Sequence, residues 1–140
     1  FMSMLFINED DFQNAMGKTK VMYLATRQND YVTSRPVSPV HKGMTIYFYT
    51  DDYSLKAIQM HANPRVAISF NTYMIEGSVR FLGFPLAPEN KEILEIYKKK
   101  YGETFEDIEN SVVFIAVDIT RIRHWIMENG EPVNMAETRY

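Results

Sequence analysis

Three residues of types that bind phosphate in proteins occur close together in the first half of the chain. Ser54 stands where a short helix is expected to begin, and Lys56 follows two residues later. The start of a helix presents backbone N–H groups without a partner in the helix, together with a partial positive charge. Lys56 adds a compact positive charge, and Arg35, on an expected strand, can add a forked contact. With Thr50 at the end of the preceding strand, these residues predict a phosphate-binding site.

Each of these residues also has an ordinary structural interpretation. Ser54 alone is typical of a helix N-cap, and Lys56 of a solvated lysine in a first helical turn. Arg35 alone is typical of a surface or interface ion pair. The local pattern therefore leaves both the phosphate site and the structural interpretation open.

The other residues that could carry chemistry indicate no metal site and no nucleophile. The chain has no cysteine, which excludes disulfides, thiolate metal ligands and cysteine nucleophiles. His41, His61 and His124 lack the spacing of metal ligands, and a structural or exposed position suits each better than proton transfer. The run 98–100 (KKK) is interpreted as a solvated helix end that matches the helix dipole. Catalytic residues are therefore not identified.

Length and charge narrow the class of protein. A chain of 140 residues suits one domain, here residues 1–140. The net charge of -3 argues against a broad nucleic-acid surface, which needs a basic balance. No apolar run approaches the roughly 20 residues that a membrane span needs. We therefore expect a soluble, cytoplasmic protein with neither a nucleic-acid nor a membrane partner.

The elements that must position the phosphate-binding residues are mostly strands. Runs of apolar, β-branched and aromatic residues predict strands over residues 21–26, 31–37, 45–50, 65–70, 75–82 and 112–127. Pro36 makes the second of these an edge strand or a strand end. Tight turns between the strands favour antiparallel pairing that closes into a barrel.

Three helices are expected beside these strands. The first ends near Gly17, the second lies within 51–63, and the third spans 88–100. In the second helix the apolar residues with helical spacing are Leu55, Ile58 and Met60. The residues from about 128 onward show no periodicity and are expected to be mobile or to lie across a partner.

The order of several short motifs resembles that of the pyridoxamine 5'-phosphate oxidase-like, FMN-binding split-barrel family. The motifs are SRPV at 34–37, IYFYT at 46–50, S-L-K at 54–56, HANPRVAISF at 61–70 and IEGSVRFLG at 75–83. The resemblance covers roughly residues 4–125. It implies a small, mainly β, antiparallel split β-barrel with flanking helices, which forms a homodimer and holds FMN at the dimer interface.

The resemblance also implies which residues bind the cofactor. Arg35 and Lys56 would bind the FMN phosphate with Ser54 assisting, while Pro36 and Val37 would offer backbone contacts along the flavin ring. Tyr49 and Thr50 would line the ring and the ribityl chain. Either Asn71 or Thr72 would come from the second subunit, and Trp125 would cover the flavin or fill the interface. The full set is Arg35, Pro36, Val37, Tyr49, Thr50, Ser54, Leu55, Lys56, Asn71, Thr72 and Trp125.

The implied function is that of an FMN-dependent oxidoreductase acting on an unknown small substrate, with NAD(P)H or another reduced carrier as electron donor. Because a flavin carries the redox chemistry itself, such an enzyme needs no side-chain acid or base. Two departures argue against vitamin B6 oxidation. The residues after Trp125 lack the arginine-rich signature of the true oxidase, and Leu55 replaces its basic residue. The alternatives are a non-catalytic flavin, deazaflavin or haem binding or sensing module, and a cofactor-free dimer.

Overall fold

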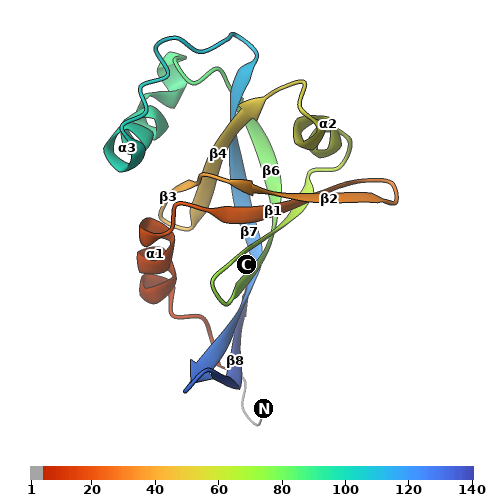
Figure 1. Cartoon of the computed structure of the whole chain (residues 1–140), viewed down its shortest axis with the longest axis vertical. Coiled ribbons are helices and arrows are strands. Elements are labelled where there is room, and N and C mark those ends of the chain that lie inside the picture. The colour runs from red at the N-terminus through yellow and green to blue at the C-terminus, as the bar shows by residue number, and fades with distance from the viewer. Residues whose placement is uncertain (1–4) are drawn as a thin grey trace.

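The computed structural model of the chain describes residues 5–140, whose strands form a single antiparallel sheet (Figure 1). In spatial order the strands are β2, β1, β5, β6, β7, β4 and β3, and β8 also pairs with β7. Their bounds are β1 Met22–Gln28, β2 Tyr31–Val37, β3 Val40–Lys42, β4 Thr45–Asp51, β5 Arg65–Phe70, β6 Tyr73–Gly83, β7 Val112–Glu128 and β8 Glu131–Arg139.

The sheet is strongly coiled and open. Figure 1 shows β1 and β2 running across β4, β6 and β7, so that the sheet curls over its own inner face. β2 and β3 end the hydrogen-bonded path and leave the barrel split between them. The predicted class, mainly β and antiparallel with flanking helices, is confirmed, and the segment with Pro36 is an edge strand as predicted.

Three α-helices and a 3-10 turn flank the sheet. They are α1 Glu9–Lys18, α2 Leu55–Ala62, the 3-10 turn η1 Pro88–Asn90 and α3 Lys91–Tyr101. Asn8 caps the start of α1, because its side chain accepts from the backbone N–H of Asp11 at 3.0 Å. None of the helices in residues 5–140 is long and apolar enough to cross a membrane.

Two groups of buried side chains hold these elements together. The larger fills the curled sheet and includes Phe12 and Met16, through which α1 covers part of the sheet. The smaller lies under α3, where Tyr97 and Phe105 pack against Phe114 of β7. α3 therefore rests on its own apolar contacts beside the main core.

The structure corrects two predictions. The C-terminal residues, expected to be irregular from about 128, form β8 and pair with β7 from Glu131 to Arg139. In α2 the buried residues are Ala57, Gln59 and Met60, whereas Leu55 and Ile58 are 45% and 48% exposed. The expected apolar side of α2 was therefore wrong for Leu55 and Ile58 and right for Met60, because Ala57 and Gln59 take the other core positions of this helix.

Candidate functional site

The guanidinium of Arg35 is held by neutral oxygen atoms. Arg35 lies on the same face of β2 as buried Val37, and its Nη1 donates to the Leu24 carbonyl at 3.2 Å and to Thr26 Oγ1 at 2.7 Å. Its Nη2 donates to Thr33 Oγ1. No ion pair within residues 5–140 includes Arg35, and burial lowers its pKa. The arginine is thus oriented without being neutralised.

Gln59 of α2 fixes the two threonines that orient this arginine. Its side chain is fully buried, and its Oε1 accepts from Thr26 Oγ1 at 2.6 Å and from Thr33 Oγ1 at 2.5 Å. Its Nε2 donates to the Tyr31 carbonyl at 3.1 Å. The sequence analysis missed this residue, because a polar residue in a short helix is ordinarily exposed and no motif marks Gln59.

The start of α2 carries the remaining predicted phosphate ligands. Ser54 is the N-cap and its Oγ accepts from the Ala57 N–H at 3.3 Å, while Thr50 Oγ1 lies 2.9 Å from Ser54 Oγ. Within residues 5–140, the N–H groups of Leu55 and Lys56 donate to no acceptor. Unpartnered N–H groups at this end of a helix favour an anion.

Lys56 is half-buried and close enough to Arg35 to feel its charge. Burial lowers the pKa of Lys56 and the positive charge of Arg35 lowers it further, while Asp51 acts in the opposite direction. No ion pair within the described part of the chain includes Lys56. Lys56 is therefore not the solvated lysine, and Arg35 not the member of an ion pair, that the alternative interpretation of the sequence expected.

Together these residues form a cationic site that suits a phosphate. Two half-buried cations, two free N–H groups and the Ser54 hydroxyl come together where β2, β4 and α2 meet. Because Arg35 and Lys56 are both positive and both partly removed from water, each disfavours the charged form of the other. A dianionic phosphate would neutralise both charges and accept from the free N–H groups, so the donor set fits that group.

The other residues predicted on this side of the molecule are placed differently. Pro36 is exposed on the edge strand and Val37 is buried in the core. Tyr49 faces the opposite side of β4 from Thr50, and its ring packs edge-on against Tyr97 at 5.4 Å and Phe105 at 4.8 Å between ring centroids. The structure therefore does not bring the Tyr49 side chain to the cationic site.

Asn71, Thr72 and Trp125 form a second group, away from the cationic site. The Thr72 carbonyl accepts from the Trp125 N–H at 3.1 Å, which joins the β5–β6 turn to β7. Asn71 adopts a positive φ of 49° in this turn and, together with α1, lines a cleft of ≈ 700 Å³. β1 and β5 separate this turn from β2 in the sheet, and Figure 1 places it near α1 rather than α2.

The outer face of β1, β5 and β6 is hollowed by two shallow grooves of ≈ 340 and ≈ 370 Å³. Both are lined by Ala25, Ala67 and Glu76. Around them lie exposed apolar side chains, with Tyr23 exposed by 53% and Val32 by 62%. This surface, called the outer face below, combines exposed apolar side chains with the two grooves.

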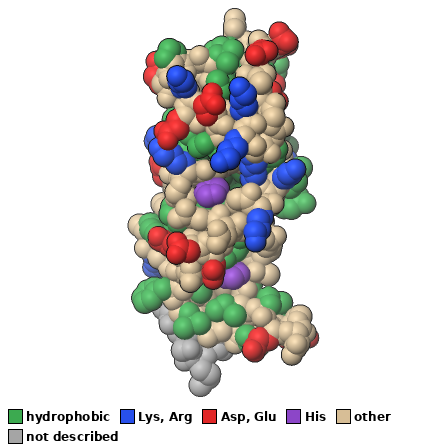
Figure 2. Space-filling model, turned by 90° about the vertical axis from the view of Figure 1, so that its left-hand side faces the viewer, with side chains coloured by type: hydrophobic (Ala, Val, Ile, Leu, Met, Phe, Trp, Pro, Cys, Tyr) green, Lys and Arg blue, Asp and Glu red, His purple; other side chains and the backbone are tan. Residues whose placement is uncertain are grey.

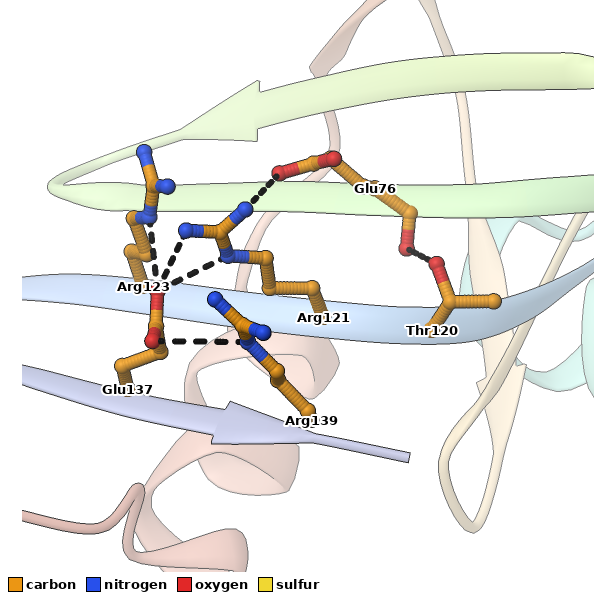
Figure 3. A network of polar contacts seen from close by, with 6 residues as sticks. All are labelled: Glu76, Thr120, Arg121, Arg123, Glu137 and Arg139. Carbon is orange, nitrogen blue, oxygen red and sulfur yellow. Dashed lines mark hydrogen bonds and ion pairs between the residues drawn. The ribbon is translucent and has the colours of Figure 1, made fainter.

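An arginine cluster borders the outer face on β7 and β8. Figure 3 shows three arginines around Glu137, whose Oε1 accepts from Arg121 Nε and Arg123 Nε, each at 2.8 Å. Arg139 Nε lies 3.7 Å from Glu137 Oε2, and Arg121 also reaches Glu76 at 3.5 Å. Three guanidinium groups share two carboxylates, so the cluster keeps a net positive charge.

His61 and His124 take structural places in the fold. His61 Nε2 lies 2.7 Å from Asp52 Oδ1 and its ring stacks on Phe81, while the ring of His124 stacks on Tyr73. Residues 5–140 contain no group of three or more His, Asp or Glu side chains placed to hold a metal ion.

An open, curled antiparallel sheet with a cationic site at the start of a short helix defines a split-barrel protein. A family model described as pyridoxamine 5'-phosphate oxidase matches residues 9–126, which is most of the chain. The chain therefore belongs to the pyridoxamine 5'-phosphate oxidase-like family, as its motifs predicted. No sequence among the curated proteins is significantly similar to it.

Solved structures confirm the split-barrel fold. A protein from Listeria innocua, described as a putative pyridoxamine 5'-phosphate oxidase, is 20% identical with a TM-score of 0.67, over 83% of this chain and 96% of that one. An FAD-binding protein from Mesorhizobium loti is 16% identical with a TM-score of 0.64, over 83% and 92%. A heme binding protein from Mycobacterium smegmatis is 15% identical with a TM-score of 0.70, over 91% and 55%. At these identities the likeness concerns the fold alone.

Proposed function

We propose that the protein binds FMN, with the FMN phosphate in the cationic site. The observation that carries this proposal is the pair Arg35 and Lys56, two half-buried cations without a carboxylate partner in residues 5–140. Arg35 would bind the phosphate through its guanidinium edge, Lys56 through its ammonium, and the start of α2 through the N–H groups of Leu55 and Lys56. Membership of the family supports a flavin as the molecule that carries this phosphate.

The edge strand β2 would hold the flavin ring. An edge strand leaves alternate backbone N–H and C=O groups without a strand partner, and these can meet the polar atoms of the ring. Pro36 is exposed at this edge and, having no N–H, offers only its carbonyl there, while Thr50 is buried beside Ser54. The segment from Arg35 to Val37 and the end of β4 would therefore position the ring and the ribityl chain through backbone groups and Thr50.

We further propose that the protein is an FMN-dependent oxidoreductase acting on a small substrate, with NAD(P)H or another reduced carrier as electron donor. When bound, the flavin supplies hydride or electron transfer. The residues of this chain would bind and orient the cofactor and keep water from one side of the ring. Such chemistry needs no side-chain acid or base beside Arg35 and Lys56.

A second copy of the chain is the proposed partner, because the outer face has the apolar centre and charged border of a protein interface. Two-fold pairing through this face is the simplest closed assembly. Asn71, Thr72 and Trp125 lie away from the cationic site of their own subunit, which supports a role at the cofactor of the partner.

The first test is an absorbance spectrum of the protein purified without added cofactor, followed by FMN titration with a thermal-unfolding readout. We expect flavin bands, or a rise in melting temperature with FMN. Ligand that binds only the native state raises stability by roughly 2.7 kcal/mol at one hundred times its Kd. A protein that is colourless and indifferent to FMN would overturn the proposal. A response to a deazaflavin or to haem alone would favour the corresponding binding module instead.

Turnover is tested separately from binding. An FMN-loaded sample that oxidises NADPH or NADH faster when a small acceptor is added would support the oxidoreductase. Tight FMN binding without reduction by either nicotinamide would favour a non-catalytic flavin module.

A further inference from the structure

A cleft between α1, β3 and α3 is lined by residues that suit an anion. It lies on the opposite side of β3 and β4 from the cationic site of Arg35 and Lys56. It has a volume of ≈ 470 Å³, within the range of small-molecule pockets. Apolar Val40 and Ile96 contribute to it, together with the nitrogen-bearing side chains of His41, Lys99 and Lys100. Among residues 5–140, no acidic side chain lines it, although the protein as a whole carries a net charge of -3.

Lys100 brings a half-buried positive charge to this cleft without a full negative partner. Its Nζ donates to the Met16 carbonyl at 3.1 Å and to the Pro39 carbonyl at 3.0 Å, and it lies 5.4 Å from the centre of the Tyr101 ring. These partners carry partial charges only. Buried charges in proteins are ordinarily matched by a counter-charge. The interpretation of this lysine run as a solvated helix end is therefore wrong for Lys100.

The neighbouring charges increase the positive potential at the cleft. No ion pair in residues 5–140 includes Lys99 or Lys100, and Glu92 of α3 is occupied by Lys42 at 2.8 Å. Burial lowers the pKa of Lys100, and repulsion by Lys20 lowers it further. Figure 2, which views the side with α1 and α3, shows lysine and arginine side chains gathered in the middle of this face.

Gly17 keeps the cleft open beside His41. A Cβ built at Gly17 would lie 3.6 Å from His41 Nε2, so a longer side chain there would cover the imidazole. Nδ1 of His41 lies 3.0 Å from the Gly43 carbonyl, which can only accept, so Nδ1 is the donor there and Nε2 donates to an anion only when it carries a hydrogen as well. The imidazole is therefore oriented and accessible from the cleft.

We propose that this cleft binds a small organic anion, with a phosphate or carboxylate head group between Lys99, Lys100 and His41 and an apolar body against Val40 and Ile96. The head group would supply the counter-charge that Lys100 lacks. The apolar body distinguishes such a ligand from a simple inorganic ion. This site does not depend on the cofactor proposal, since it shares no residue with the cationic site of Arg35 and Lys56.

The test is titration of ¹⁵N-labelled full-length protein with phenyl phosphate and with benzoate in phosphate-free buffer, after the protein has been loaded with FMN and the unbound FMN, which would itself compete for an anion site, has been removed. Benzyl alcohol serves as the neutral control. We expect saturable amide shifts concentrated around residues 17, 40–41 and 96–100 for at least one of the two anions, and none for the alcohol. Shifts concentrated instead around Arg35 and Lys56, or shifts that do not saturate, would overturn the proposal. Phenyl phosphate and benzoate together distinguish a phosphate from a carboxylate head.

Matched variants decide whether the anion binds in the cleft or is attracted only by the overall positive charge of α3. Lys99→Gln and Lys98→Gln each remove one positive charge from the same helix, but only Lys99 lines the cleft. We expect Lys99→Gln to weaken binding about tenfold, the loss of one charge-assisted contact, and Lys98→Gln to change it less than about twofold. Equal effects of the two substitutions would show diffuse electrostatics and contradict the proposal.

A variant that blocks the cleft gives an independent readout. Gly17→Leu suits a helix better than glycine does and covers His41, so it is expected to abolish binding while the protein stays folded. Lys100→Gln is less suitable, because it also removes two contacts to backbone carbonyls. Unchanged anion binding in Gly17→Leu would contradict the proposal.

Discussion

At the scale of single residues, the proposed cofactor site is a set of charges and hydroxyls held in place by one buried amide. Gln59 accepts from Thr26 and Thr33, and these hydroxyls in turn accept from Arg35. The guanidinium is thus fixed before a phosphate arrives, which lowers the entropic cost of binding it. The same arrangement leaves Arg35 and Lys56 repelling each other in the free protein.

Replacing Gln59 should damage both stability and cofactor binding. Gln59→Leu leaves the Tyr31 carbonyl and the two threonine hydroxyls without their partner, and each unsatisfied buried group costs about 1–3 kcal/mol. We expect urea unfolding to show a loss of at least about 2 kcal/mol, with weaker FMN binding in the folded fraction. Gln28→Leu, at an exposed end of β1, is the control. A fully stable Gln59→Leu protein would contradict this role.

Removing Lys56 should stabilise the protein without cofactor, and the gain should depend on pH. Burial and Arg35 lower the folded-state pKa of Lys56, while the unfolded chain keeps a value of about 10.4. Below the folded pKa the charged lysine carries its full penalty. Between the two values the unfolded state holds more protons, so wild-type stability rises with pH. The advantage of Lys56→Met in the free energy of unfolding is therefore largest near neutral pH and shrinks toward about pH 10.4.

This prediction is checked by urea unfolding of both proteins at several pH values. The apolar contacts of the new methionine contribute equally at every pH. The informative quantity is therefore how the difference in unfolding free energy between Lys56→Met and the wild type changes with pH. A wild-type advantage that grows as pH falls to neutrality would show that Lys56 is held by an attraction instead, and would contradict a lowered pKa of Lys56.

At the scale of elements, the coil of the sheet depends on an irregularity between β6 and β7. The register shifts between Glu76 and Gly77, and a Cβ at Gly77 would stand 2.7 Å from the Asp118 carbonyl oxygen and 2.8 Å from a Val117 methyl. Real Cβ atoms do not approach backbone so closely, so only glycine lets the strands meet here. The extra residue here is Thr120, so the bulge bends β7 and helps the sheet to close over its core.

Gly77→Ala is therefore expected to destabilise the protein by about 1–3 kcal/mol, the usual cost of overpacking. Thermal or urea unfolding measures this loss. Gly43→Ala offers a comparison, since a Cβ there meets nothing within 4 Å and only its positive φ of 56° is strained. A smaller effect at Gly77 than at Gly43 would argue against the close contact as the main constraint.

The elements also show where sequence patterns succeed and where they fail. β4, β5 and β7 could be predicted because each is a run of apolar, β-branched or aromatic residues. β8 could not, because its residues alternate weakly and it is held mainly by pairing with β7. The cationic residues of the candidate site were found through their motifs. Gln59 was not, because its role comes from tertiary contacts with Thr26 and Thr33 that no local pattern encodes.

At the scale of the whole molecule, the outer face sets the expected assembly. Ala67 lies at its centre, opposite Glu76 on β6 and bordering both grooves. Ala67→Lys would pair favourably with Glu76 in a single chain but would bury an ammonium in a two-fold interface. The substitution therefore separates folding from association.

We expect the wild-type protein to sediment as a dimer and Ala67→Lys as a folded monomer with weakened FMN binding. Removing the new ammonium and its Glu76 partner from water at an interface costs several kilocalories per mole, so the dimer Kd should rise at least about 100-fold. Asn110→Lys, at an exposed position before β7, is the control. A monomeric wild-type protein that still binds FMN would contradict the proposed shared site.

The central claim, that Arg35 and Lys56 hold the phosphate of a flavin, is tested most directly by comparing FMN with riboflavin. Riboflavin carries the same ring and ribityl chain without the phosphate. The cofactor-free protein is titrated with each of the two compounds and followed by fluorescence, and the ratio of their Kd values gives the contribution of the phosphate to binding. We predict that FMN binds at least about 100-fold more tightly, because two charge-assisted contacts are each worth about 1.5–3 kcal/mol. Lys56→Met should lose most of this preference. Equal affinity for FMN and riboflavin, or an FMN preference that Lys56→Met leaves unchanged, would contradict the account.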